Sequence, residues 1–491
     1  MNLSRSLLPP MRLRRGVAAS AIALAVCAWI PSGAWSAEPT TNAALAEQLA
    51  PLLSTYTRAV KPGDQIDDFR DLFASVFRRV QRGYALEVDI PTLVAAAVKA
   101  IDPVKPASGE ADAVFKTAIN AALGILDPHS SYLDAKEHRS QGESISGSFG
   151  GLGIEVDMSE GLVRVVSPMD DSPASRAGLK SGDLIVRFDD QAVLGLTLNE
   201  AVTRMRGQPG TPITLLVRRP GRADDFSVAL VRETIRTQAL RARMEDDVLV
   251  LRLARFTGAV GTDIEKAIAS MTQKSLPSAV VLDMRGNPGG LLNQAVAVAD
   301  IFLSQGEIVS LRGRTAGNQR TWRANAAEQL AGVPMVVMLD GGSASAAELV
   351  AAALQENGRA VVMGQRSYGK GSVQTVIPLG EKKGALRLTT ALYHGPSGRT
   401  VQLTGVGPDI ELVVAATTPA ARGGRREADR SRALPGGDQI TPPKASVEQA
   451  RCPKPAQGSD LALSCALAYI KAGGVDNFVA TLDAPGTPVL Q

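Results

Sequence analysis

The sequence has 491 residues, a formal net charge of +4 at pH 7, and only 4% aromatic residues. Its lysines and arginines are spread along the chain rather than clustered, which argues against a nucleic-acid-binding protein. The low aromatic content also argues against surfaces that stack bases or sugars. A chain of this length predicts two or three folded domains.

The first 37 residues have the pattern of a secretory signal peptide. Several arginines precede an apolar stretch at 16–30, and Ala34-Trp35-Ser36 would suit a cleavage site. The apolar stretch is short for a spanning helix, although an uncleaved copy would anchor the chain in the inner membrane. We therefore expect an exported, periplasmic protein with no transmembrane span in the mature chain, which begins at residue 38.

Cysteine usage fits an exported protein, in which disulfides can persist. Cys27 would be lost with the signal peptide, and this leaves Cys452 and Cys465 in the mature chain. We expect these two cysteines to form a disulfide. The alternative is two free thiols in a loosely ordered tail.

Residues 38–145 are predicted to form a helical region. Apolar residues recur at helical spacing in three stretches, at 69–80, 93–101 and 115–126. Pro91 would suit the first turn of the second helix. Such stripes favour packing in a core, with a surface for a partner as the alternative.

Residues 146–235 have the pattern of a small β-rich module. Short apolar runs are separated by Ser172-Pro173-Ala174 and by the segment AGLKSGD at 177–183. These segments resemble the PDZ domains of exported proteases. The resemblance implies that an extended peptide adds as a strand, beside a helix at 198–205. The loop that would bind its terminal carboxylate, where glycine allows close approach of the backbone, consists of Gly151, Leu152, Gly153 and Ile154.

Residues 236–414 alternate strands and helices, a pattern typical of an α/β core. Short apolar runs predict buried strands, at 248–253, 278–284, 333–339, 360–364 and 386–393. Helices are expected between these strands, at 262–271, 291–303 and 346–355.

Candidate catalytic residues lie around the last of these helices. Ser343 and Ser345 stand at its start, where free N–H groups and the helix dipole can stabilise an oxyanion. The stretch has no histidine, but a lysine can act as a base if burial lowers its pKa, and Lys370 follows in a polar loop. Taken singly, such a serine is usually a helix cap and such a lysine a solvated loop residue.

Together, GSASAAE (342–348) and SYGKGSVQ (367–374) resemble the active-site signature of the carboxy-terminal processing proteases, tail-specific serine endopeptidases with a Ser–Lys dyad. The resemblance implies that Ser345 is the nucleophile and that Lys370, 25 positions later, is the general base. Gln374 would orient the lysine. Ala347 stands where many members have serine, and Glu356 where some have aspartate, and we expect neither to abolish activity.

Other segments carry the same resemblance: DPHSSY (127–132), LDMRGNPGG (282–290), YHGPSGR (393–399) and GVGPDI (405–410). It implies an oxyanion hole made by the N–H of Ala346 and that of Gly289 or Gly290, between which the sequence does not decide. His129 and His394 are expected to be structural. The implied fold is a crotonase-like mixed αβ protease core with an inserted PDZ domain and an N-terminal helical region, whose helices often help the family to dimerise.

After residue 414 the composition changes. The charged, glycine- and proline-containing stretch up to about residue 443 predicts a linker. A short helix at 461–471, held by Cys452–Cys465, is expected in the C-terminal tail, and it matches no part of the family core.

The predicted function is that of a periplasmic serine endopeptidase. It would capture C-terminal tails of proteins with its PDZ domain and cleave them through an acyl-enzyme. No metal or cofactor is implied, and the HExxH motif is absent. The expected partners are proteins with accessible C-termini, with a lipoprotein adaptor and a homo-oligomer left open by the resemblance. The alternatives are a catalytically inactive PDZ-containing scaffold and a crotonase-like acyl-CoA enzyme.

Overall fold

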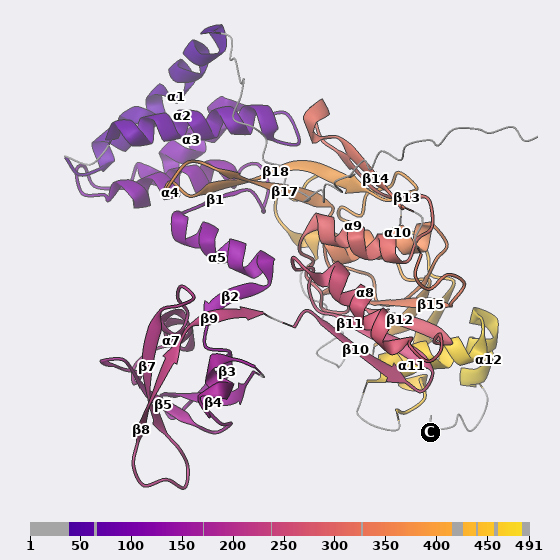
Figure 1. The fold of residues 1–491 in the computed structure, drawn as a ribbon. Coiled ribbons are helices and arrows are strands. Elements are labelled where there is room, and N and C mark those ends of the chain that lie inside the picture. The colour runs from indigo at the N-terminus through magenta and orange to yellow at the C-terminus, as the bar shows by residue number, and fades with distance from the viewer. Residues whose placement is uncertain are drawn as a thin grey trace, which may run out of the picture.

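The computed structural model describes residues 39–62, 66–169, 171–236, 238–325, 328–414, 426–437, 440–455 and 460–483. The predicted signal peptide lies outside the described residues. Figure 1 shows a group of N-terminal helices, a β-rich module and a larger α/β core. Within the described ranges, no helix has the length and apolar character needed to cross a membrane.

The N-terminal region is built from four helices whose apolar faces meet. Asp89 caps the third helix by accepting the N–H of Thr92. The buried faces form one cluster that also takes in Leu386 and Leu388 of β18 (Ala385–His394), so the predicted apolar stripes are core packing. The helices are α1 (Pro39–Ala59), α2 (Ile66–Gly83), α3 (Ile90–Ile101) and α4 (Ala111–Leu123).

Two short elements lead from these helices to the β-rich module. β1 (Ser131–Leu133) pairs antiparallel with β18. Asp134 then caps α5 (Ala135–Ser146), which Gly147 ends in the left-handed conformation. A glycine suits this position because a Cβ is disfavoured there.

The β-rich module is an insertion with a two-stranded stem. β2 (Ser148–Gly151) and β9 (Glu233–Arg236) pair antiparallel where the chain enters and leaves it. Its sheet has the order β3-β4-β5-β7-β8, with β6 paired to β5, so β3 lies at an edge. The strands are β3 (Ile154–Ser159), β4 (Leu162–Pro168), β5 (Leu184–Phe188), β6 (Gln191–Ala192), β7 (Pro212–Arg218) and β8 (Phe226–Val231), and the helices are α6 (Pro173–Arg176) and α7 (Leu198–Met205).

The core is organised by a sheet of seven strands in the order β10-β11-β12-β15-β16-β19-β20. All neighbours are parallel except β10 and β11. Every residue of β12 and β15 is buried, as expected for parallel strands covered on both faces. The strands are β10 (Leu240–Glu245), β11 (Val248–Leu253), β12 (Ala279–Asp283), β15 (Met335–Leu339), β16 (Val361–Gly364), β19 (Ile410–Val413) and β20 (Ala445–Glu448).

Helices cover both faces of this sheet. One apolar cluster includes α8 (Val260–Met271), α9 (Leu292–Ile301) and α10 (Ala346–Glu356). Another includes α11 (Leu461–Ala472) and α12 (Val475–Asp483). A second sheet, which joins the core to the N-terminal helices, contains β1, β18, β13 (Glu307–Arg312), β14 (Arg320–Arg323) and β17 (Ser372–Pro378), and the turn η1 (Ala316–Asn318) precedes β14.

The C-terminal segment differs from the predicted linker. Residues 426–437, which include the turn η3 (Glu427–Asp429), pack on the core, and β20 extends the core sheet beyond residue 414. Composition misled the prediction because the arginines of this segment bind backbone carbonyls, while Leu434 is buried among the N-terminal helices. Residues 415–425 lie outside the described residues.

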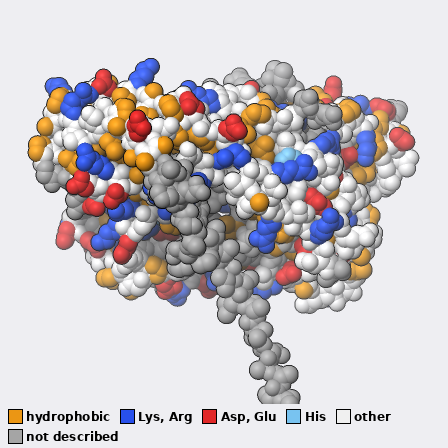
Figure 2. Space-filling view, turned by 90° about the horizontal axis from the view of Figure 1, so that it is seen from above, with side chains coloured by type: hydrophobic (Ala, Val, Ile, Leu, Met, Phe, Trp, Pro, Cys, Tyr) orange, Lys and Arg blue, Asp and Glu red, His pale blue; other side chains and the backbone are white. Residues whose placement is uncertain are grey.

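A disulfide links the first C-terminal helix, α11, to the segment that follows β20. The structure joins Cys452 and Cys465, which are both buried. The turn η4 (Gln449–Arg451) leads into the first of these cysteines. Acidic and basic side chains are interspersed on the face shown in Figure 2, as the even spread of charge along the sequence suggests.

Candidate active site

Three turns meet at one edge of the core sheet. β12, β15 and β16 are adjacent and parallel, so their carboxyl ends lie together. The segments that follow these strands carry Gly289, Ser345 and Lys370, respectively. Ligands of open α/β sheets commonly bind at this edge. The structure therefore brings together three segments that are far apart in the sequence.

Ser345 has a strained backbone at the junction between β15 and α10. Its φ is 57° and its ψ is −114°, a conformation that L-residues rarely adopt and that costs on the order of 1–3 kcal/mol. A Cβ at Gly289 would lie 2.8 Å from the Cβ of Ser345 and 3.0 Å from the nitrogen of Ala346, so glycine is required there. A serine held on a sharp strand-to-helix turn is a common arrangement for a nucleophile.

Ser343 differs from Ser345 in its contacts. It is fully buried, and its hydroxyl donates to the carbonyl of Met284 at 2.9 Å while accepting the N–H of Asp340 at 2.9 Å. Ser343 therefore fastens the turn after β15 to the turn after β12.

One buried carboxylate connects Ser345 with the lysine loop, which we define as residues 365–371. Oε2 of Glu348 accepts the backbone N–H of Ser345 at 2.7 Å and that of Lys370 at 2.9 Å. Oε1 accepts the Ser367 hydroxyl and the Gly369 N–H, both at 2.6 Å. Burial raises the pKa of Glu348, whereas these four donors favour its ionised form. Glu348 thus fixes the spacing between the two segments.

Lys370 has the electrostatic character of a potential base. Burial lowers its pKa from the ordinary value near 10.5 to about 8, although nearby carboxylates oppose the change. Its Nζ donates to Oε1 of Gln374 at 2.5 Å and to the carbonyl of Ser372 at 3.0 Å. An amine with this pKa is partly neutral near pH 7 and can accept a proton.

The amide of Gln374 is oriented by a relay from the N-terminal region. Its Nε2 donates to the hydroxyl of Thr389 at 3.2 Å, and that hydroxyl donates to Oδ1 of Asp127 at 3.0 Å. Gln374 stands opposite Thr389 next to a β-bulge between β17 and β18, a feature that commonly re-aims side chains. The relay leaves Oε1 of Gln374 facing the ammonium of Lys370.

The backbones of Ser345 and Lys370 share one oxygen of Glu348, but their side chains make no direct bond. Among the hydrogen bonds of the described residues, none joins the Ser345 hydroxyl to the Lys370 ammonium. The hydroxyl of Tyr393 donates to the carbonyl of Lys370 and also interacts with the Ser345 side chain. Catalytic hydrogen bonds are often absent without substrate and form in the complex.

The predicted oxyanion donors differ in availability. The N–H of Gly289 donates to Oδ1 of Asn287 at 2.9 Å. Among the hydrogen bonds of the described residues, none uses the N–H of Gly290 or that of Ala346. Gly290 also lies so close to Phe256 that a Cβ would meet the Phe256 carbonyl at 2.1 Å. Two free donors therefore border the Ser345 turn.

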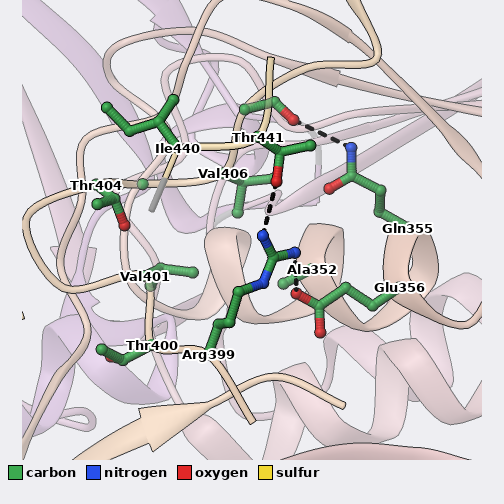
Figure 3. A pocket seen from close by; sticks show the side chains of 12 residues that line it. Ala352, Gln355, Glu356, Arg399, Thr400, Val401, Thr404, Val406, Ile440 and Thr441 are labelled. Carbon is green, nitrogen blue, oxygen red and sulfur yellow. Dashed lines mark hydrogen bonds and ion pairs between the residues drawn. The ribbon is translucent and has the colours of Figure 1, made fainter. Parts of the chain in front are cut away.

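Glu356 lies away from this cluster, at the far end of α10. Its carboxylate pairs with Arg399 at 3.1 Å and accepts the N–H of Ser397 at 2.8 Å. Figure 3 shows the Arg399 guanidinium between Glu356 and Thr441, beside a cavity of about 30 Å³. Glu356 therefore has a structural role, in which it holds the turn after β18 against the end of α10.

The predicted peptide-binding loop follows β2 and leads into the edge strand β3. No hydrogen bond of the described residues uses the N–H groups of Leu152 and Gly153. Their carbonyls accept the backbone N–H groups of Ala174 and Met169, respectively. Gly153 has a φ of +70°, and a Cβ there would meet Ser172 at 2.3 Å. An edge strand preceded by free N–H groups can accept an extended peptide with a terminal carboxylate.

Comparison with known proteins identifies the family of this chain. The sequence model of Peptidase family S41 matches residues 247–412, and that of the PDZ domain matches residues 150–230. A carboxy-terminal-processing protease of Bartonella bacilliformis is 49% identical over 301 residues, which cover 60% of this chain and 69% of that protein. The chain belongs to the carboxy-terminal processing proteases. The predicted family, and the predicted αβ fold with a PDZ domain and N-terminal helices, are confirmed.

Other relatives agree at lower identity. A carboxy-terminal processing protease of Bacillus subtilis is 32% identical over 302 residues, which cover 61% of this chain and 64% of that protein. The matched part of this chain thus spans about two thirds of these relatives. Among solved structures, the photosystem II D1 C-terminal processing protease matches 74% of this chain and 98% of its own, with 25% identity and a TM-score of 0.45.

Several residues of the site were not predicted from the sequence. Glu348 had a local signal, since Ser345 and Glu348 form the S-x-x-E pattern of a capping box. Asp127 and Tyr393 lie in segments that carry the family resemblance, but nothing local showed their place in the site. Thr389, Gln402 and Glu427 had no such signal, because segments distant in the sequence supply them.

Loss of the Thr389 hydroxyl tests the relay to Gln374. We expect Thr389→Val to lower kcat about threefold to tenfold with KM nearly unchanged, because the amide loses one of the two hydroxyls that orient it and keeps only that of Ser372. The measurement is steady-state cleavage of a peptide. Thr375→Val is the matched control, since among the described residues the Thr375 hydroxyl bonds only that of Thr390, on the same pair of strands. Equal losses in both variants would contradict the relay.

Proposed function

We propose that this protein is a serine endopeptidase that cleaves proteins near their C-termini, with Ser345 as the nucleophile and Lys370 as the general base. One observation carries the proposal: the carboxylate of Glu348 ties the strained Ser345 turn to the loop of a lysine with a depressed pKa. Strain and a perturbed pKa in one small region are typical of catalytic sites. Membership of a protease family supports the same assignment.

The proposed reaction is acyl transfer to serine. Neutral Lys370 takes the proton of the Ser345 hydroxyl as the oxygen attacks the substrate carbonyl. The resulting oxyanion is stabilised by the N–H groups of Gly290 and Ala346, which are free in this structure. Lys370 then gives its proton to the leaving amine, and water hydrolyses the acyl-enzyme. Gln374 keeps the Lys370 ammonium in place between these steps.

In this reaction Lys370 exchanges one of its hydrogen bonds before it takes the Ser345 proton. In the structure the ammonium donates to the carbonyl of Ser372 and to Gln374. We propose that the amine exchanges the Ser372 contact for the Ser345 hydroxyl when substrate displaces the Tyr393 interaction.

The PDZ domain would present the substrate. A peptide added to β3 would place its terminal carboxylate at the free N–H groups of Leu152 and Gly153. A cavity of about 520 Å³ is lined by Phe149 of the stem and by Gly286 and Pro288 of the turn after β12. We propose that the substrate chain passes through this cavity. We place the protein in the periplasm, so its substrates and any lipoprotein adaptor would also be exported proteins.

Amidation of the substrate C-terminus tests capture by the PDZ domain. We expect an amidated peptide to have a KM about tenfold higher than the free acid, because the charge-assisted hydrogen bonds to the loop are lost. The measurement is cleavage of a matched pair of peptides with apolar C-termini. Equal KM values would exclude the carboxylate-binding role of the loop. If neither peptide is cleaved, a serine-directed fluorophosphonate that also fails to label the protein would favour the inactive scaffold.

A further inference from the structure

The C-terminal segment lies against the lysine loop. We call residues 426–437 the strap. Arg426 donates from Nη2 to the carbonyl of Ser367 at 2.7 Å, and the backbone N–H of Glu427 donates to the carbonyl of Tyr368 at 3.2 Å. Arg430 donates from Nε to the hydroxyl of Tyr368 at 2.5 Å. The strap is therefore bonded to the two residues that begin the SYGKG turn.

Within the strap, Glu427 is fully buried. Its two carboxylate oxygens lie 2.8 and 3.0 Å from Nε2 of His129, which comes from the segment before β1. Arg430 lies 3.9 Å away. Burial opposes ionisation of this carboxyl, but the hydrogen bond and charge of His129 and the charge of Lys370 hold its pKa below the ordinary range. Glu427 is a buried anion that the proposed reaction does not use.

Gln402 links Glu427 with the residue next to Lys370. Its Nε2 donates to Oε1 of Glu427 at 3.3 Å, and its Oε1 accepts the N–H of Gly371 at 2.8 Å. Gln402 is itself fully buried. The carboxylate and the Leu434 carbonyl, which accepts the same Nε2 at 3.3 Å, therefore orient an amide whose oxygen holds the backbone just after Lys370.

Four charged groups from four elements act on Lys370. Glu427 of the strap, Glu348 of α10 and Asp127 before β1 are acidic, and Arg387 of β18 is basic. Glu348 and Asp127 already bind backbone N–H groups and hydroxyls. Glu427 is the carboxylate with the largest effect on Lys370, and it favours the protonated amine.

We propose that Glu427 is a positioning residue of the active site: its buried carboxylate, bonded to His129, holds the lysine loop through Gln402 and adds a fixed negative charge to the site. This proposal rests on the proposed role of Lys370 as the base. In the reaction, the ammonium forms when Ser345 attacks and disappears when the leaving amine departs. A nearby fixed anion stabilises the ammonium at the stage where the oxyanion also exists. The C-terminal segment thus completes the catalytic site.

The Glu427→Gln variant separates the effect of the negative charge from that of the side chain's shape and hydrogen bonds. Glutamine can still accept from Gln402 and bond His129, so the main loss is the negative charge. With that charge removed, Lys370 releases its proton more easily. We expect the acidic limb of the kcat/KM profile to move to lower pH by about half a unit or more. The plateau should fall by roughly threefold to tenfold because the ammonium is less stable during the reaction.

The experiment measures pH profiles of peptide cleavage and thermal unfolding for the purified protein and its variants. Glu427→Asp keeps the charge on a shorter side chain. The acidic limb of its kcat/KM profile should therefore stay at the wild-type pH, while the plateau falls at least threefold. Glu328→Gln is the matched control, because Glu328 pairs at 2.6 Å with Arg359 and is likewise mostly buried. Its profile should equal that of the wild type.

The outcomes separate this inference from the proposed function. A folded Glu427→Gln variant with an unmoved limb would overturn the electrostatic role, provided that Lys370→Ala is inactive in the same assay. Activity in Lys370→Ala would instead overturn the base on which the inference rests. If Glu427→Gln does not fold, a wild-type plateau in Glu427→Asp would overturn the positioning role.

Discussion

Ser345→Ala is expected to abolish peptide cleavage, with kcat/KM falling at least about 10⁴-fold. The Ser345 hydroxyl forms the proposed acyl-enzyme, and Ser345 stands beside Gly289, next to the free N–H of Ala346. The fold should be unaffected because the Ser345 side chain does not hold the helix start, where Glu348 accepts the backbone N–H. Activity assays and thermal unfolding of the same preparation measure both effects.

Ser343→Ala is the matched control for this variant, because it removes a hydroxyl two residues away. Here the buried Met284 carbonyl and Asp340 N–H lose a partner, which should destabilise the fold by about 1–3 kcal/mol. We expect a lowered Tm and an activity within tenfold of the wild type well below that Tm. If Ser343→Ala were inactive and Ser345→Ala active, the assignment of the nucleophile would be wrong.

Lys370→Ala should lower kcat/KM by on the order of 10³-fold or more, because the Ser345 hydroxyl would lose its base. The backbone N–H of residue 370 would still bind Glu348, so the loop should keep its position. The variant should also label slowly with a fluorophosphonate, since labelling needs the same deprotonation. Wild-type rates in this variant would show that another group is the base.

The pH dependence of the wild type gives an independent check on Lys370. The base acts in its neutral form, and burial has lowered its pKa to about 8. We therefore expect kcat/KM to rise about tenfold per pH unit below about pH 8 and to level off above it. Lys370→Arg should be inactive at every pH because a guanidinium stays protonated. A wild-type profile that is flat between pH 6 and pH 8 would contradict the assignment.

Local sequence predicted most elements of the core. The helix at 346–355 and the strand at 360–364 match α10 and β16 to within one residue at each end. These segments carry strong local signals, such as alanine-rich helix formers and short runs of buried apolar residues. Strands with weak signals, β13, β14 and β17, were not predicted, because partly exposed strands alternate less clearly.

The C-terminal segment shows why composition alone can mislead. Charge and glycine content predicted a linker, but Arg426 and Arg432 bind the carbonyls of Ser367 and Gly124 in two different parts of the fold. Whether an arginine is solvated or bound to a buried carbonyl depends on which surface the chain meets. That surface is assembled from segments hundreds of residues apart.

By itself, the sequence determined the family and pointed to Ser345, Lys370 and Gln374 as the proposed catalytic residues, because these follow from short motifs with fixed spacing. The tertiary structure decided what surrounds them: the strain at Ser345, the four bonds of Glu348, the relay from Asp127 to Gln374, and the burial of Glu427. Hydrogen bonds and pKa shifts depend on distances of a few ångströms and on exclusion of water. Only folding brings the groups of distant segments to such distances.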